Sequence, residues 1–197
     1  ANAPVVSNVS LGVGSVFSGV TALSWSGSDA DNDALTYTVE YDPDVTAPHN
    51  DYEEIVANIK DTRWTEDFSR LAGGNHAKIR ITASDGVNSA FAESAEFRVP
   101  FKAPDVTIKP LAAATVIQGT EVVLDALVED LQDSELPDAS LVWASDLAGR
   151  IGSGQVMVAK NLAPGTHTIT LTATNSGGVS TSKTVQVTVT PTTRRLP

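Results

Sequence analysis

The chain of 197 residues carries a formal net charge of −11, is 41% hydrophobic and contains no cysteine. Its length predicts one large domain or two small ones, at about 100–200 residues per domain. The absence of cysteine excludes a disulfide framework and cysteine-based catalysis, and no apolar run approaches the roughly 18 residues of a membrane helix. An acidic surface repels phosphate, so nucleic acid is not an expected partner.

Apolar residues recur at every second position in most segments, which is the pattern of half-buried antiparallel strands. In chain order, the alternating segments are 35–41, 78–84, 121–130, 166–174 and 184–189. Residues 51–60 (DYEEIVANIK) come closest to a helical pattern, and we expect a turn or one helical loop there. Glycine, asparagine, aspartate and proline separate the strands, so the sequence predicts an all-β sandwich architecture.

An internal repeat sets the number of domains. Residues 71–99 and 162–189 both read as turn, strand, turn and strand, with one residue gained or lost between His76/His167 and Thr82/Thr172. A period of about 90 residues fits one β-sandwich per repeat. We therefore expect one sandwich at 1–100 and another at 105–190, with a short, stiff linker at 101–104 between two prolines and a tail at 191–197.

Several motifs resemble known repeat families. "LSW" and "DALTYTVEY" in residues 23–41 resemble strands B and C of fibronectin type III domains. "LAPGTHTITLTATNSGG" at 162–178 resembles the closing strands of PKD-like and related immunoglobulin-like repeats of bacterial surface and secreted proteins, and "SDADNDALTY" at 28–37 resembles the same families and cadherin-like repeats. The resemblance implies two tandem immunoglobulin-like antiparallel β-sandwiches, the first of fibronectin type III type and the second of PKD type. Fibronectin type III domains have a tyrosine at the corner where the chain enters strand F, and His76 and His167 stand near that position here. We expect both histidines to cap this corner through hydrogen bonds to the backbone.

An acidic loop follows the first tryptophan-bearing strand. Asp29, Asp31 and Asp33 match the first three ligand positions of an EF-hand, but the glycine required next is missing, and Glu40 lies too far along a strand to close the coordination sphere. In an immunoglobulin-like sandwich, the B–C and F–G loops gather at one pole. Asp85, in the second loop, would then join the three aspartates in a Ca²⁺ site. The alternative is that these residues shape Asx-turns and stay solvated.

A second acidic loop lies in the C-terminal half of the chain. It contains Asp130 and Asp133, and Asp105 is in or near the junction with the first domain. The sequence therefore suggests a Ca²⁺ ion at the joint that would stiffen a rod of domains, as in cadherin-like arrays. The loop could equally be packed against the first domain.

No catalytic group stands out in the sequence. The three histidines, His49, His76 and His167, are scattered, and no nucleophile, phosphate-binding or metalloprotease motif is present. Trp64 has charged neighbours and lies near Tyr52, which makes these two residues the first place to seek a carbohydrate site. Three other aromatic residues are in phase with the core: Trp25, Tyr37 and Trp143.

These observations favour a non-catalytic structural or adhesive module of a larger exported bacterial protein. We expect an extracellular or cell-surface location, with other domains of the parent chain, and a cell-surface protein or polysaccharide, as partners. Ca²⁺ is the one expected cofactor, and insertion into a membrane is not expected. The alternative function is a carbohydrate- or protein-binding accessory module of a secreted hydrolase.

Overall fold

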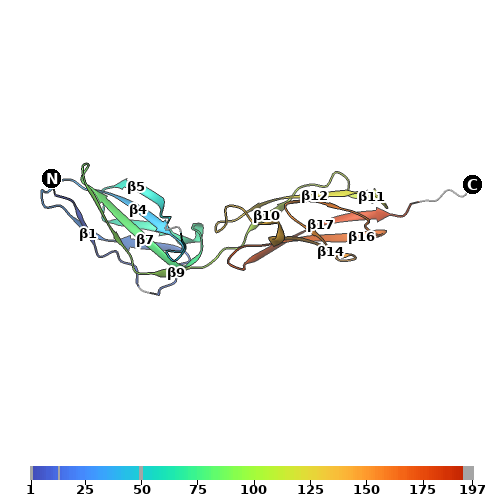
Figure 1. The fold of residues 1–197 in the computed structure, drawn as a ribbon, viewed down its shortest axis with the longest axis horizontal. Helices are drawn as coiled ribbons and strands as arrows, with labels where there is room; N and C mark the ends of the chain where they lie inside the picture. The colour runs from blue at the N-terminus through green and yellow to red at the C-terminus, as the bar shows by residue number, and fades with distance from the viewer. Residues whose placement is uncertain (1, 13, 49–50, 193–197) are drawn as a thin grey trace, which may run out of the picture. The chain divides into compact units, whose positions relative to one another are not determined.

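The computed structural model describes residues 2–12, 14–48 and 51–192. The chain divides into two compact units, residues 1–101 (unit 1) and 102–197 (unit 2) (Figure 1). Each unit has a hydrophobic core of its own. Apart from two short 3-10 helices, the regular elements of the described residues are all strands, and none of the described helices is long and apolar enough to cross a membrane. The fold is therefore all-β, as the sequence predicts.

Unit 1 is built from two layers of mainly antiparallel strands. Its elements are β1 (Val5–Ser7), β2 (Val20–Ser24), β3 (Ser26–Ser28), β4 (Thr36–Asp42), β5 (Glu53–Ile59), β6 (Arg63–Asp67), the 3-10 helix η1 (Phe68–Arg70), β7 (Gly74–Ser84), β8 (Ser89–Glu93) and β9 (Phe97–Val99). One layer holds the pairs β2–β6 and β1–β3, and the other has the order β5-β4-β7-β8, with β9 also paired to β7. Trp25 alone separates β2 from β3, so these two strands act as one interrupted strand.

Unit 2 repeats this plan, and its last strand is continuous. Its elements are β10 (Asp105–Ile108), β11 (Thr115–Ile117), β12 (Val122–Glu129), the 3-10 helix η2 (Asp138–Ser140), β13 (Leu141–Ser145), β14 (Gly149–Ser153), β15 (Val156–Ala159), β16 (Gly165–Thr174) and β17 (Ser180–Thr190). The sheets have the orders β10-β12-β15 and β11-β17-β16-β13-β14. These are strands A, B and E facing strands G, F and C, so both units are immunoglobulin-like sandwiches.

The cores follow the alternation seen in the sequence. In unit 1, the odd-numbered residues of β4 and, from Ala77 onward, of β7 are buried, and Trp25 packs edge-to-face on Tyr37 with ring centroids 5.5 Å apart. In unit 2, Trp143 is fully buried and its indole N–H donates to the carbonyl of Gly154 at 2.9 Å. The prediction that these three aromatic residues serve the cores is confirmed.

The expected turn or helical loop at residues 51–60 is wrong, because most of this segment forms strand β5. Its pairing with β4 is irregular, with Tyr37 opposite Ile59 but Val39 opposite Val56. Asn58 has a left-handed backbone with φ of 59°. A bulge of this kind shifts the two-residue alternation partway along the strand, and the shift hides the strand from periodicity.

The residue by which the two repeats differ is part of a β-bulge in unit 1. Gly74 faces Val99 but Ala77 faces Phe97, so β7 has one residue more than β9 over this stretch. In unit 2 the corresponding pairing of β16 with β17 is continuous, and His167 faces Val187. The structural counterpart of His167 is therefore Ala77, and pairing His167 with His76 by sequence is off by one residue.

The predicted capping role is correct for His167 and wrong for His76. The ring of His167 is fully buried, with Nε2 2.8 Å from the carbonyl oxygen of Ala163 and Nδ1 2.8 Å from Oγ of Ser145. His76 lies in the bulge, exposed, with Nδ1 3.1 Å from Glu96. The bulge turns this side chain out of the core, so it cannot reach the corner.

Unit 1 caps the same corner with a different residue. The hydroxyl of Tyr41 donates to the carbonyl of Ala72 at 2.7 Å. Tyr41 faces Ile79 in β7 just as Ser145 faces Ile169 in β16, so Tyr41 and Ser145 are structural counterparts. Unit 1 thus combines a large residue on β4 with Ala77 on β7, whereas unit 2 combines a small residue on β13 with a large one on β16.

We predict that the corner of unit 1 can be transplanted into unit 2. His167→Ala should destabilise unit 2 by roughly 2–4 kcal/mol, because it opens a cavity and removes the hydrogen bonds of the ring to Ser145 and to the carbonyl of Ala163. Ser145→Tyr alone should overpack the core. The double variant should be more stable than the two single effects predict when added, as measured by urea unfolding with hydrogen exchange read on peptides of β16. If the effects of the two substitutions on the free energy of unfolding simply add, the side chains at positions 145 and 167 do not compensate for each other in volume.

Candidate functional site

The acidic loop of unit 1 gathers three carboxylates at one place. Asp29, Asp31 and Asp33 each offer an oxygen, and these oxygens lie within 4.8 Å of one another. The loop is closed by an Asx-turn, because Oδ1 of Asp29 accepts the backbone N–H of Asp31 at 2.8 Å and of Asp33 at 3.3 Å. Asn32, with φ of 60°, completes the tight backbone.

The three carboxylates differ in how far other groups satisfy them. Asp31 accepts the backbone N–H of Asn2 at 2.6 Å and the side-chain amide of the same residue at 3.0 Å. Oδ2 of Asp29 is buried and has no hydrogen-bond partner among the described residues. Asp33 is exposed, and Lys60 lines the same open hollow. The loop is thus a structural Asx-turn that still presents carboxylate oxygens to solvent and to any cation.

Asp85 does not join this group. Its carboxylate accepts the backbone N–H groups of Val87 at 2.7 Å and Asn88 at 2.6 Å, which holds the pKa of Asp85 below its ordinary value. The two loops are nevertheless neighbours, because the side chain of Asn88 donates to the carbonyl of Asn2, which in turn bonds Asp31. The structure therefore gathers the B–C and F–G loops but uses Asp85 to shape its own turn.

In unit 2, the acidic residues proposed as ligands are also engaged in loop structure. Asp130 accepts the backbone N–H of Gln132 at 2.8 Å and the side-chain amide of Asn175 at 3.0 Å, and Asp133 accepts the N–H of Ser176 at 2.8 Å. Asp105 lies in β10 opposite Glu129. Within the ranges that the structure describes, only the Asp29 group brings three such ligands together. A Ca²⁺ site built from Asp105, Asp130 and Asp133 stays a prediction of the sequence.

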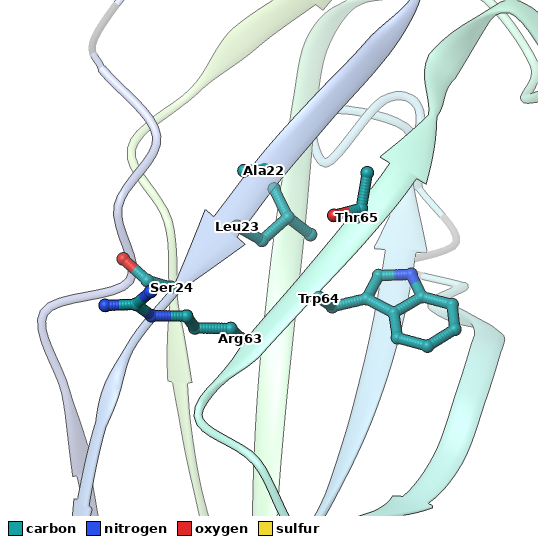
Figure 2. Close-up of a pocket in the computed structure, with 6 residues that line it drawn as sticks. All are labelled: Ala22, Leu23, Ser24, Arg63, Trp64 and Thr65. Carbon is teal, nitrogen blue, oxygen red and sulfur yellow. The ribbon is translucent and has the colours of Figure 1, made fainter.

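Trp64 belongs to the edge of the core rather than to an exposed aromatic surface. It lies on β6 opposite Leu23 of β2, packs against the core of unit 1, and donates its indole N–H to Glu66 at 2.9 Å. Figure 2 shows the open hollow beside it, which has a volume of about 380 Å³ and is lined by residues of β2 and β6. The lining residues are Ala22, Leu23, Ser24, Arg63, Trp64 and Thr65.

Tyr52 immediately precedes β5, which belongs to a different sheet from β6 and Trp64, so the two residues do not form one aromatic platform. Its ring is covered by the guanidinium of Arg80, 4.1 Å from the ring centroid, and Arg80 also lies 5.5 Å from the ring of Phe91. The same guanidinium donates to both carboxylate oxygens of Glu40, at 2.6 and 2.9 Å. This bond holds the pKa of Glu40 below its ordinary value.

The sequence reasoning overlooked this cluster of Tyr52, Arg80, Phe91 and Glu40, although a signal for it was present. Alternation in residues 35–41 and 78–84 points Glu40 and Arg80 away from the core, and antiparallel pairing of these two strands puts them opposite each other. The exposed Phe91, on β8, could not be found in this way, because an isolated surface aromatic is common.

The two histidines in the described ranges form no catalytic arrangement. His76 pairs with Glu96 at the surface and His167 is a buried cap, and the two belong to different units. The remaining candidate, His49, lies outside the described residues.

No protein-family model and no curated protein matches this sequence. Among solved structures, the FN1–FN3 domains of chicken CNTN1 are similar over 96% of this chain and 67% of that chain, at 16% identity and a TM-score of 0.34. The N-terminal four Ig domains of Dscam1 isoform 4.44 are similar over 95% of this chain at 15% identity and a TM-score of 0.42.

The N-terminal Ig1-2 module of the Drosophila receptor protein tyrosine phosphatase DLAR is similar over 98% of this chain and 100% of that chain, at 10% identity and a TM-score of 0.33. The present chain spans 45% of the Dscam1 chain, which is less than half. Likenesses this weak carry no inference about function, and the immunoglobulin-like fold rests on the strand order of the two units.

Proposed function

We propose that this chain is a non-catalytic structural or adhesive tandem module of a larger exported bacterial protein. The observation that supports the proposal best is shared by both units: a segment near the start of each unit pairs in parallel with its last strand. In unit 2, β11 pairs in parallel with β17, and in unit 1, Val16 forms a parallel bridge with Arg98.

The parallel contacts are closed by short backbone hydrogen bonds. In unit 2, Gln118 donates to the carbonyl of Thr190 and Thr188 donates to the carbonyl of Ala114, both at 2.8 Å. Unit 1 has the equivalent contacts through Arg98, which accepts from Phe17 at 2.9 Å and donates to Ser15 at 2.8 Å. These bonds tie the beginning of each sandwich to its end.

This geometry suits a unit that transmits tension along its chain. When the first and last strands of a unit pair in parallel, the chain enters at one end of the pair and leaves at the other end. Tension between the two chain ends then slides the strands past each other and loads all the hydrogen bonds of the pair at once. In an antiparallel hairpin, the same pull would open them one after another. Resistance to forced unfolding depends on the barrier to unfolding rather than on equilibrium stability, and bonds that break together raise that barrier.

We place the parent protein outside the bacterial cell or at its surface, and we expect other domains of the parent chain as its direct neighbours. This part of the proposal rests on the resemblance of residues 28–37 and 162–178 to repeats of bacterial surface and secreted proteins. The alternative of a carbohydrate-binding accessory module gains no support, because Trp64 packs against the core and Tyr52 is covered by Arg80.

We predict that breaking one bond of the parallel pair weakens unit 2 against force. Gln118→Pro removes the backbone N–H that bonds Thr190, whereas Gln118→Ala keeps it and serves as the control. In single-molecule pulling of the full chain, one of the two unfolding events should occur at lower force in the proline variant and at unchanged force in the control. Equal forces in all three proteins would argue against the shear geometry as the source of resistance.

We further propose that the acidic loop of unit 1 binds Ca²⁺ through Asp29, Asp31 and Asp33. The support is the approach of three carboxylate oxygens within 4.8 Å and the buried Oδ2 of Asp29, which has no hydrogen-bond partner in the part of the chain that the structure describes. Calcium takes six to eight oxygen ligands, and backbone carbonyls and water can complete the set in an open loop. A bound ion would hold the B–C loop in one conformation.

The expected result for this loop is a stabilisation of unit 1 by Ca²⁺. At 100 times its dissociation constant, the ion should add about 2.7 kcal/mol to the free energy of unfolding, seen as a higher Tm with Ca²⁺ than with a chelator. Replacing the three aspartates with asparagine should make the shift smaller, and Asp61→Asn, an exposed charge change elsewhere in unit 1, should preserve it in full. An unchanged Tm at millimolar Ca²⁺ would remove this part of the proposal.

A further inference from the structure

Asp42 is a buried carboxylate on the outer face of the β5-β4-β7-β8 sheet. It is the last residue of β4 and is 3% exposed. Its Oδ1 accepts the backbone N–H of Asp44 at 2.9 Å, and its Oδ2 is buried with no hydrogen-bond partner among the described residues. An ionised carboxylate is rarely buried without pairing or metal coordination, because removing its charge from water is costly.

The two basic side chains nearest to Asp42 on this face of the sheet are bonded to other carboxylates. Lys78 is the cross-strand partner of Asp42, but its ammonium bonds Glu93 at 2.9 Å. Arg80, two residues further along β7, donates both of its bonds to Glu40. No hydrogen bond or ion pair from either base therefore reaches Asp42.

The surroundings of Asp42 are negative and rich in oxygen. Burial raises the pKa of Asp42, and the negative charges of Asp44, Asp51 and Glu93 raise it further. The hydroxyl of Tyr52 is buried as well. Burial raises the pKa of Tyr52, and the negative charges of Glu93 and Asp42 raise it further. Two buried oxygen atoms, from the end of β4 and from the residue just before β5, thus share a negative region beside the sheet.

We propose that Asp42 is a ligand of a second hard cation, of the Ca²⁺ class, bound beneath Tyr52. Oδ2 of Asp42 is the buried oxygen available to it, and the Tyr52 hydroxyl, the Glu93 carboxylate beside that hydroxyl, and water would complete the coordination. The cation would supply the charge that Lys78 and Arg80 do not give to Asp42. This inference does not rest on the Asp29 loop or on the role of the chain under tension.

Calcium titration of the full chain by calorimetry separates the two sites. Asp42→Asn should lose one bound ion per chain and keep the other, while the triple asparagine variant of the Asp29 loop should keep the ion at Asp42. Asp61→Asn should bind as the unchanged protein does. Circular dichroism checks that the Asp42→Asn protein is folded. If Asp42→Asn binds the same number of Ca²⁺ ions as the unchanged protein, the inference is overturned.

A second measurement keeps the test decisive if Asp42→Asn does not fold. Crystals of the unchanged protein soaked in TbCl₃ should show an anomalous peak at roughly 2.3–2.6 Å from Oδ2 of Asp42, the distance of a calcium-like ligand. Finding only a water molecule there, or no density, would overturn the site. A peak confined to the Asp29 loop would support the first cation site and reject this one.

Discussion

The register of β4 against β7 determines both faces of unit 1. Because Tyr41 faces Ile79 and Glu40 faces Arg80, one set of alternate residues forms the core and the other forms the charged outer face. A slip of one residue would exchange the two sets and bury an ion pair in place of the core. The covered ring of Tyr52 and the burial of Asp42 both depend on this register, since Arg80 and Asp42 belong to the outward set.

The two units reach one corner geometry by different means. In both, a backbone carbonyl before strand F receives a hydrogen bond from the core, at Ala72 in unit 1 and Ala163 in unit 2. Unit 1 supplies the donor from β4, and the neighbouring position on β7 is then Ala77. The hydrogen bond to the corner carbonyl is therefore common to both units, whereas the residue that makes it is not.

Much of the fold could be predicted from the sequence, because alternation is strong wherever a strand has one buried face. The segments 35–41, 78–84 and 166–174 show this, and all three are strands. The failures have local causes. A bulge in β5 and another in β7 each shift the phase of the pattern, so that one strand was missed and His76 was paired with the wrong position.

The candidate sites were harder to predict, because proximity in a loop says little about what a carboxylate bonds. The sequence indicated Asp29, Asp31 and Asp33 through their spacing, and the loop does gather them. It also suggested Asp85, which is an acidic loop residue like the other three. Its carboxylate, however, accepts hydrogen bonds from two backbone N–H groups of its own turn. Which carboxylate oxygens lack a hydrogen-bond donor depends on the backbone conformation of each loop. The spacing of acidic residues does not predict that conformation.

The two acidic regions of unit 1 also differ in how much they need a cation. At the Asp29 loop, backbone N–H groups already satisfy one oxygen, and two of the three side chains reach solvent, so water can satisfy much of the rest. At Asp42, the unpaired oxygen is cut off from water, and the neighbouring bases are bonded elsewhere. A bound ion is therefore an addition to the first region, whereas at the second it would relieve a cost that the fold itself creates. The number of acidic residues in a segment is a poor guide to this difference, because Asp31 and Asp42 each have two acidic neighbours within two residues in sequence.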